Sequence, residues 1–170
     1  WEQVTLHELQ IQHNLKVPEF KQWFSSENIT VVMFALEMIA WYKQRGVGKE
    51  ILELFEHENE KVRSKSYKVC GEIGLKMALP AMVRKYPEES FRNKLEILIA
   101  FTKVPDETYL AFLKNVLDTE EDVQLQIEAT KAMENTGEPG ISMLIKLMKS
   151  KSEYKNYQII IRHVLDGRIY

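Results

Sequence analysis

The sequence predicts an all-α protein built as a solenoid of about five helical hairpins. Segments that begin with Asn or Asp and continue with apolar residues at helical spacing recur about every 31 to 32 residues, a period typical of helical repeat proteins. Shorter apolar segments lie between them, so that each recurring helix has a partner. Gly and Pro are scarce, at seven and five of 170 residues, which favours helices joined by short turns.

The second helix of each hairpin is expected near residues 28–45, 59–73, 90–104, 122–136 and 154–166. Three of these segments start at Asn28, Asn59 or Asp122, residue types that cap helix N-termini. Apolar or small residues follow at positions i, i+4, i+7 and i+8, the spacing of one buried helix face. The expected inward residues are Val31, Ala35, Met38, Ile39 and Tyr42; Val62, Ser66, Val69, Cys70 and Ile73; Phe91, Leu95, Leu98 and Ile99; Leu125, Ala129, Ala132, Met133 and Thr136; and Tyr157, Ile161, Val164 and Leu165.

The first helix of each hairpin is expected in residues 17–24, 48–57, 77–86, 106–117 and 139–150. A proline lies near the start of three of them, where a missing backbone N–H costs nothing: Pro18, Pro80 and Pro139. Three glycines are expected to close the preceding helices in the left-handed conformation: Gly46, Gly74 and Gly137. Residues 15–170 form the predicted repeat domain, and residues 1–14 form an N-terminal helix that caps its first hairpin.

Composition narrows the classes of function. The 23 Lys and Arg residues against 25 Asp and Glu residues give a formal charge of −2, so no global field draws the protein to nucleic acid or anionic lipid. A single Cys excludes an internal disulfide framework and a thiolate-rich zinc site, and it favours a reducing compartment, expected to be the cytoplasm. The longest near-apolar run, residues 29–42, is too short to cross a bilayer.

Residues 59–83, NEKVRSKSYKVCGEIGLKMALPAMV, carry a specific motif. An Asn cap precedes the pair Val62-Arg63, the sequence GEIG ends the helix, and Ala-Leu-Pro opens the next one. This segment resembles a bacterial HEAT-like repeat of the HEAT/armadillo superfamily, and the likeness in spacing covers about residues 17–170. Val32 and Gln126 stand where the pattern would place Arg in two other repeats.

The resemblance implies a right-handed α-α superhelix whose second helices line a concave binding face. It also implies a structural role for Arg63, which in such repeats pairs with an acidic side chain or a helix end. One HEAT-like enzyme, deoxyhypusine hydroxylase, ligates iron through His-Glu pairs that directly follow Val-Arg. Ser64 and Lys65 occupy those positions here, so the resemblance does not extend to a metal site.

No catalytic residue and no cofactor is predicted. The two His-Glu pairs, His7-Glu8 and His57-Glu58, lie outside the ligand positions of the resembling enzyme. Cys70 lies on the inward stripe, where a buried thiol packs as a small hydrophobe. The sequence also lacks nucleophile-elbow and phosphate-loop motifs.

One row of side chains on the second helices is expected to face the groove. On one helix this row is Lys61, Lys65 and Lys68. Glu37 and Glu128 stand in the equivalent rows of other helices, so nucleic-acid binding is disfavoured. Large apolar residues exposed in such a row are typical of protein-binding hot spots, and the row also contains Phe34, Trp41, Ile160 and His163.

The sequence therefore predicts a non-catalytic scaffold for binding another protein. The expected partner contacts are Phe34, Trp41, Lys65, Lys68 and Arg92. Two alternatives for the aromatic residues stay open: the N-terminal helix covers them, or the helix phase is shifted by one residue. Two other functions stay open as well. One is a lyase-type HEAT-like protein that binds a small chromophore, and the other is the soluble domain of a membrane-anchored protein, which residues before Trp1 would decide.

Overall fold

The structure is a computed structural model that describes residues 17–150 and 157–167. Every regular element within these residues is a helix, and they contain no strand, which confirms the predicted all-α class. The elements, with η for a 3-10 helix, are η1 Val17–Ser25, α2 Ile29–Trp41, η2 Arg45–Val47, α3 Gly48–Glu53, η3 Leu54–Glu56, α4 Glu60–Ile73, η4 Lys76–Ala78, α5 Leu79–Lys85, η5 Tyr86–Glu88, α6 Phe91–Lys103, η6 Glu107–Tyr109, α7 Leu110–Thr119, α8 Val123–Asn135, α9 Glu138–Lys149 and α10 Tyr157–Asp166. The predicted capping helix in residues 1–14 lies outside the described residues.

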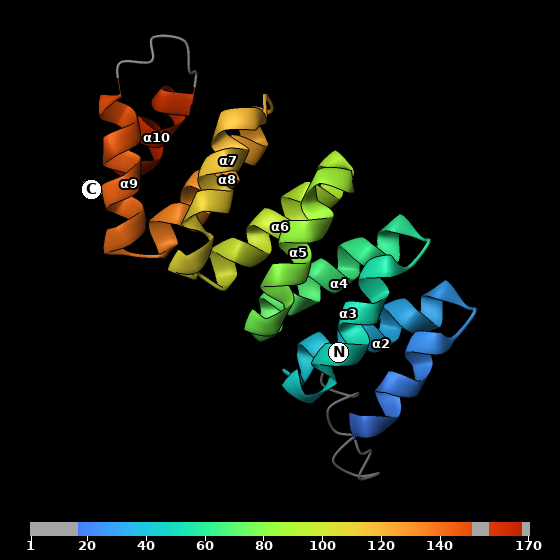
Figure 1. Cartoon of the computed structure of the whole chain (residues 1–170). Coiled ribbons are helices and arrows are strands. Elements are labelled where there is room, and N and C mark those ends of the chain that lie inside the picture. The colour runs from blue at the N-terminus through green and yellow to red at the C-terminus, as the bar shows by residue number, and fades with distance from the viewer. Residues whose placement is uncertain (1–16, 151–156, 168–170) are drawn as a thin grey trace.

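The helices α2, α4, α6, α8 and α10 pack in chain order, each against the next; we call them the stacked helices. Figure 1 shows them as a row in which the colour passes from blue at α2 to red at α10. The shorter elements alternate with the stacked helices along the chain, and α3, α7 and α9 each contact at least one of them. One stacked helix lies within each range predicted for a second helix.

Four stacked helices begin at equivalent capping residues. Asn28, Asn59, Ser90 and Asp122 each accept a hydrogen bond from a backbone N–H of the first turn, which satisfies a donor that the helix cannot pair internally. Successive caps are 31, 31 and 32 residues apart. The period read from the sequence is therefore present in the helix starts, including Ser90, at which the predicted range 90–104 begins.

The C-terminal end of α4 is held by the turn that follows α2. Gly74 closes α4 with φ +68°, in the left-handed conformation expected for it. Lys43 donates from Nζ to the Glu72 carbonyl oxygen at 2.7 Å, and Arg45 donates from Nε to the Ile73 carbonyl oxygen at 2.8 Å. Two cations thus satisfy the last carbonyls of α4 and lie at the negative end of its dipole.

Gly46 does not close the helix before it, so this prediction was wrong. The C-cap of α2 is Tyr42, and the next residue, Lys43, takes the positive φ of 53°. Gly46 lies inside η2 instead. Gly137 does have a positive φ, +83°, at the turn between α8 and α9.

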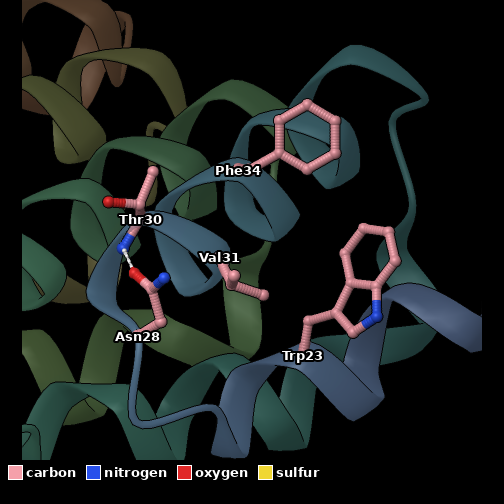
Figure 2. A pocket seen from close by; sticks show the side chains of 5 residues that line it. All are labelled: Trp23, Asn28, Thr30, Val31 and Phe34. Atoms are coloured by element: carbon pink, nitrogen blue, oxygen red, sulfur yellow. Dashed lines mark hydrogen bonds between the residues drawn. The ribbon is translucent and has the colours of Figure 1, made fainter.

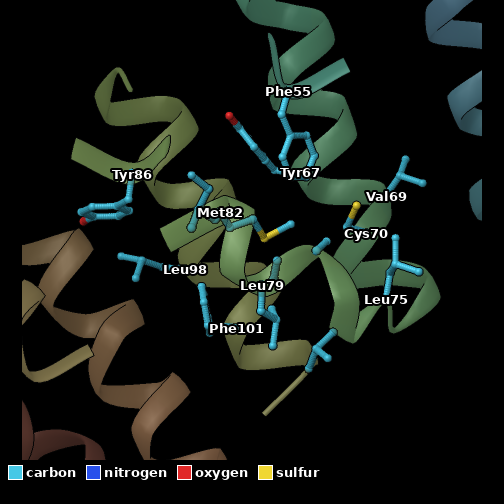
Figure 3. Packing of buried hydrophobic residues seen from close by; sticks show 14 of the residues in the cluster. Phe55, Tyr67, Val69, Cys70, Leu75, Leu79, Met82, Tyr86, Leu98 and Phe101 are labelled. Carbon is cyan, nitrogen blue, oxygen red and sulfur yellow. The ribbon is translucent and has the colours of Figure 1, made fainter. Parts of the chain in front are cut away.

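The hydrophobic core lies between successive stacked helices and the shorter elements beside them (Figure 3). A Cβ atom on Gly71 of α4 would lie 2.9 Å from the Cα atom of Ala100 of α6, so the absence of a side chain lets these helices approach closely. All five inward residues predicted for α4 are buried: Val62, Ser66, Val69, Cys70 and Ile73.

Most residues of the predicted stripes of α2 and α8 are buried, but the buried faces are wider than predicted. In α2, Val31 and Tyr42 are only half-buried, and Val32, Leu36 and Ala40 are buried in addition to the expected residues. In α8, Thr136 is half-buried. The buried residues of both predicted stripes are Ala35, Met38, Ile39, Leu125, Ala129, Ala132 and Met133.

The register of α6 differs from the prediction. Phe91, expected inward, is 46% exposed, because the cap at Ser90 places Asn93 at the position equivalent to Val62. Asn93 is fully buried and donates to the buried carboxylate of Glu89 at 2.7 Å. The apolar character of the sequence could not indicate that a polar residue fills this core position. The inward residues of α6 are Asn93, Ile97, Leu98, Ala100 and Phe101, with Leu95 and Ile99 half-buried.

The exposed face of α10 is also shifted from the prediction. Ile160, expected to face the groove, is buried together with Ile161, whereas Ile159 is 74% exposed. Because α10 packs against both α8 and α9, these two contacts decide which of its faces is covered. The side chains of Tyr157 and His163 lie outside those that the structure describes. The half-buried members of the predicted stripe are Val164 and Leu165.

Candidate functional site

A buried polar cluster joins α4 to the turn before α6. Arg63 donates from Nε and Nη2 to the two carboxylate oxygens of Glu89, at 2.8 and 3.1 Å. Its Nη1 donates to the carbonyl oxygens of His57 and Glu58, at 2.9 and 3.2 Å. The guanidinium therefore makes the contacts with an acidic side chain and with backbone carbonyls that the resemblance implied for Arg63.

Glu89 is a charged acceptor with all its donors in place. Its side chain is 2% exposed, and it also accepts the Tyr67 hydroxyl at 2.8 Å and the Asn93 amide at 2.7 Å. Burial alone would raise its pKa, but the bonds from Arg63, Asn93 and Tyr67 together outweigh burial and hold the pKa below the ordinary value of 4.5. Burial, and then the bond to Glu89, raises the pKa of the Tyr67 hydroxyl. A carboxylate with a shifted pKa can mark a catalytic site. The Glu89 carboxylate is buried, however, and its hydrogen bonds all go to side chains of the protein, so we assign it a structural role.

The charged state of Glu89 should make the stability depend on pH. Because the folded pKa lies below the unfolded value, the contribution is complete above about pH 4.5 and is lost as the pH falls through the folded pKa. We expect the free energy of unfolding to fall more steeply between about pH 5 and pH 3 in the wild type than in Glu89→Gln, by up to about 1.4 kcal/mol per pH unit. Urea unfolding at a series of pH values measures both slopes. Equal slopes of unfolding free energy against pH in the two proteins would contradict a lowered pKa of Glu89 in the folded state.

The same position recurs in the next two stacked helices. Lys94, 31 residues after Arg63, donates to the Glu120 carboxylate at 2.8 Å and lies over the Tyr86 ring, 5.2 Å from its centroid. Gln126, predicted to stand where Arg would, donates to the Glu120 carbonyl oxygen at 2.7 Å. These side chains fasten the turns that precede the stacked helices, so we assign them to structure.

Cys70 lies in the core of α4, beside Val69 and near Leu75 in Figure 3. Burial raises the pKa of its thiol to about 12. Because a nucleophilic cysteine must reach the thiolate state, this residue acts as a small apolar side chain, the role that its position on the stripe indicated.

In the part of the chain that the structure describes, no three His, Cys, Asp or Glu side chains gather where they could hold a metal ion. The Nδ1 atom of His57 accepts a hydrogen bond from the backbone N–H of Asn59 at 2.9 Å and is therefore already occupied. The pair His7-Glu8 lies outside the described residues. Within 17–150 and 157–167, no helix combines the length and the apolar character that a membrane span requires.

An apolar cavity opens between η1 and α2. Its volume is about 470 Å³, and it is lined by Trp23, Asn28, Thr30, Val31 and Phe34. In Figure 2, Trp23 comes from the η1 ribbon, Phe34 from α2, and Val31 lies between them. The ring centroids of Trp23 and Phe34 are 5.9 Å apart, yet the two side chains remain 37% and 42% exposed.

Phe34 and Trp41, which the sequence predicts in the groove-facing row, are each 42% exposed on α2. They are seven residues apart, about two helical turns, and so share one face of the helix. Trp23 was not predicted. Residues 17–24 were expected to form a first helix, and nothing in the sequence indicated that the Trp23 ring of η1 would contact the Phe34 ring.

The predicted basic contacts differ in their availability. Lys65 forms an ion pair with Glu37 of the neighbouring helix α2 and is mostly covered. Lys68 is exposed and lies 4.0 Å from the Glu72 carboxylate, which Lys103 of α6 approaches to 3.9 Å. Lys65 therefore links two stacked helices through an ion pair, whereas the Lys68 side chain remains 45% exposed.

Arg92 is exposed and, like Lys61, has no ion pair or hydrogen-bonded partner among the described side chains. Lys61, Arg92 and the cavity residue Thr30 each follow a capping residue by two positions. They therefore occupy equivalent places on adjacent stacked helices. We call Lys61 and Arg92 the cationic row; it continues from the cavity across α4 and α6.

The cavity and the cationic row form the candidate site, and none of the residues that line the cavity has a titratable side chain. No model of a known protein family matches this chain, and no curated protein matches it in sequence.

Proposed function

We propose that this chain is a non-catalytic scaffold that binds another protein on the surface of its stacked helices. The observation that carries the proposal is the cavity beside Trp23 and Phe34, because large exposed aromatic side chains around an apolar hollow are typical of binding hot spots. The proposed contacts are Phe34, Trp41, Lys65, Lys68 and Arg92, with Lys65 acting through its pair with Glu37.

A HEAT-like superhelix of about five hairpins is the architecture that we propose for this scaffold. Hydrogen bonds between residues about one period apart support it, since such bonds join each repeat to the next. These links are Lys43 to Glu72, Arg45 to Ile73, Glu56 to Lys85, and Thr102 to Asn135.

A second candidate is the binding of a small planar ligand, as in the lyase-type alternative. The cavity volume of about 470 Å³ favours this second candidate, because that volume lies in the range of small-molecule pockets. The lining has no titratable side chain to perform chemistry, so we rank it below protein binding. Absorbance titration with a tetrapyrrole tests it directly.

Affinity purification from the source organism, with the full-length protein as bait, tests the proposed function. We expect Phe34→Ala and Trp41→Ala each to reduce recovery of the same partner by at least about tenfold. Met77→Ala is the matched control, since Met77 is an exposed apolar residue on η4, outside the stacked helices. Equal recovery with all three variants would refute the placement of the contacts.

A further inference from the structure

We propose that the partner presents an extended acidic segment to this surface. One large apolar side chain of the segment enters the cavity beside Trp23 and Phe34. Carboxylates about three and six residues away pair with Lys61 and Arg92. This inference rests on the proposed function and adds the chemical class of the partner to it.

The cavity selects an apolar side chain. Of the five residues that line it, Trp23, Val31 and Phe34 are mainly apolar, and none carries a charge. The side-chain oxygen Oδ1 of Asn28 already accepts the Thr30 backbone N–H at 2.9 Å, so this acceptor serves the helix cap. A charged group would lose its hydration here and meet no charged partner in the lining, whereas an aromatic or aliphatic group would cover Trp23 and Phe34.

The cationic row selects carboxylates. Neighbouring cations are neutralised within the protein, as Arg63 is by Glu89 and Lys94 by Glu120, but Lys61 and Arg92 are not among the ion pairs of the described residues. Both lie in the first turn of a helix, where a positive side chain is unfavourable with the helix dipole. Their placement does not serve helix stability, which favours a role in binding.

Helix packing sets the spacing of the segment. The axes of packed helices lie about 8 to 10 Å apart, and an extended chain advances about 3.3 Å per residue. A segment that crosses from α2 to α4 to α6 therefore passes one helix about every three residues. Its pattern is an apolar residue followed, in one chain direction, by acidic residues at the third and sixth positions.

A protein segment suits this surface better than a nucleic acid. Glu37 of α2 and Glu96 of α6 lie on the same helices, and Glu60 beside Lys61 is bonded to Ser90. A nucleic acid carries a charge at every phosphate and would meet these carboxylates. A peptide can place its acidic residues over Lys61 and Arg92 and neutral residues elsewhere.

Fluorescence polarisation with labelled peptides tests the inference. The probe has a central Leu and Asp at the third and sixth positions on both sides, so that it fits in either chain direction. We expect the full chain to bind it at least about tenfold more tightly than versions with Ser for Leu or Lys for Asp. Lys61→Glu and Arg92→Glu should each weaken binding at least about tenfold, and Phe34→Ala should do the same. Arg84→Glu is the control, because Arg84 is an exposed cation on α5 and should leave binding unchanged.

The outcomes separate this inference from the proposed function. If Phe34→Ala loses the natural partner in affinity purification but the acidic probe binds no better than its Lys version, the scaffold function stands and the acidic partner is refuted. Equal affinity for a single-stranded oligonucleotide would also refute it, in favour of a general polyanion site. If neither Phe34→Ala nor Lys61→Glu affects recovery of any partner, the proposed function fails as well.

Discussion

Glu89→Ala is expected to lower the free energy of unfolding by about 3 kcal/mol, because removing one member of a buried ion pair leaves the other uncompensated. The loss falls at the lower end of the usual range of about 3 to 5 kcal/mol, since the Arg63 side chain keeps 22% exposure. The hydroxyl of Tyr67 and the amide of Asn93 would lose their acceptor as well. Chemical denaturation, followed by circular dichroism, measures the change.

Glu88→Ala is the matched control for this prediction. Glu88 is the adjacent residue, its side chain is 74% exposed, and it lies 3.5 Å from Lys85. Exposed pairs of this kind contribute about 0 to 1 kcal/mol. A double-mutant cycle with Arg63→Ala should give a coupling energy of about 1 to 3 kcal/mol. Equal losses for Glu88→Ala and Glu89→Ala would show that the buried cluster contributes nothing specific.

Gly140→Ala is expected to destabilise the C-terminal part of the stack. A Cβ atom at this position would lie 1.8 Å from the carbonyl oxygen of Met133, a backbone atom at the end of α8 that cannot move aside like a flexible side chain. Helix α9 would have to shift away, and the buried Leu144 and Leu147 would lose packing. We expect a loss of about 3 kcal/mol, at the upper end for overpacking.

Hydrogen exchange followed by mass spectrometry locates this second effect. Protection should fall most in α9 and α10, because α10 packs on α9. Gly46→Ala is the control, since a Cβ atom there would have no atom within 4 Å, and its stability should stay within about 0.5 kcal/mol of wild type. A loss in Gly140→Ala no larger than in Gly46→Ala would contradict the close approach of α9 to α8.

The local pattern of the chain predicted most helices because each depends on neighbouring residues. Caps at Asn28, Asn59 and Asp122 and the inward stripe of α4 were correct for this reason. The register of α6 was not, because it was taken from the most apolar residues. The predicted range 90–104 did begin at the cap, Ser90, but its inward stripe was started at Phe91 instead of at Asn93, the third residue after the cap.

The candidate site depended less on local pattern. Phe34 and Trp41 were placed on an exposed face correctly, since two turns of one helix decide that relation. Whether a cationic side chain is available or paired depends on a residue about one period away: Glu37 pairs with Lys65, while Lys61 and Arg92 have no such partner among the residues that the structure describes. Ile160 was misplaced because α8 and α9 together choose the buried face of α10.

The sequence by itself determined the helical class, the helix starts and the period, because capping and helical spacing act within a few residues of the chain. Only the tertiary structure decided that Asn93 and Glu89 share a buried cluster with Arg63, and that Trp23 meets Phe34 beside a cavity. These contacts join residues from different elements. Their formation depends on how the elements pack, which no short stretch of sequence specifies.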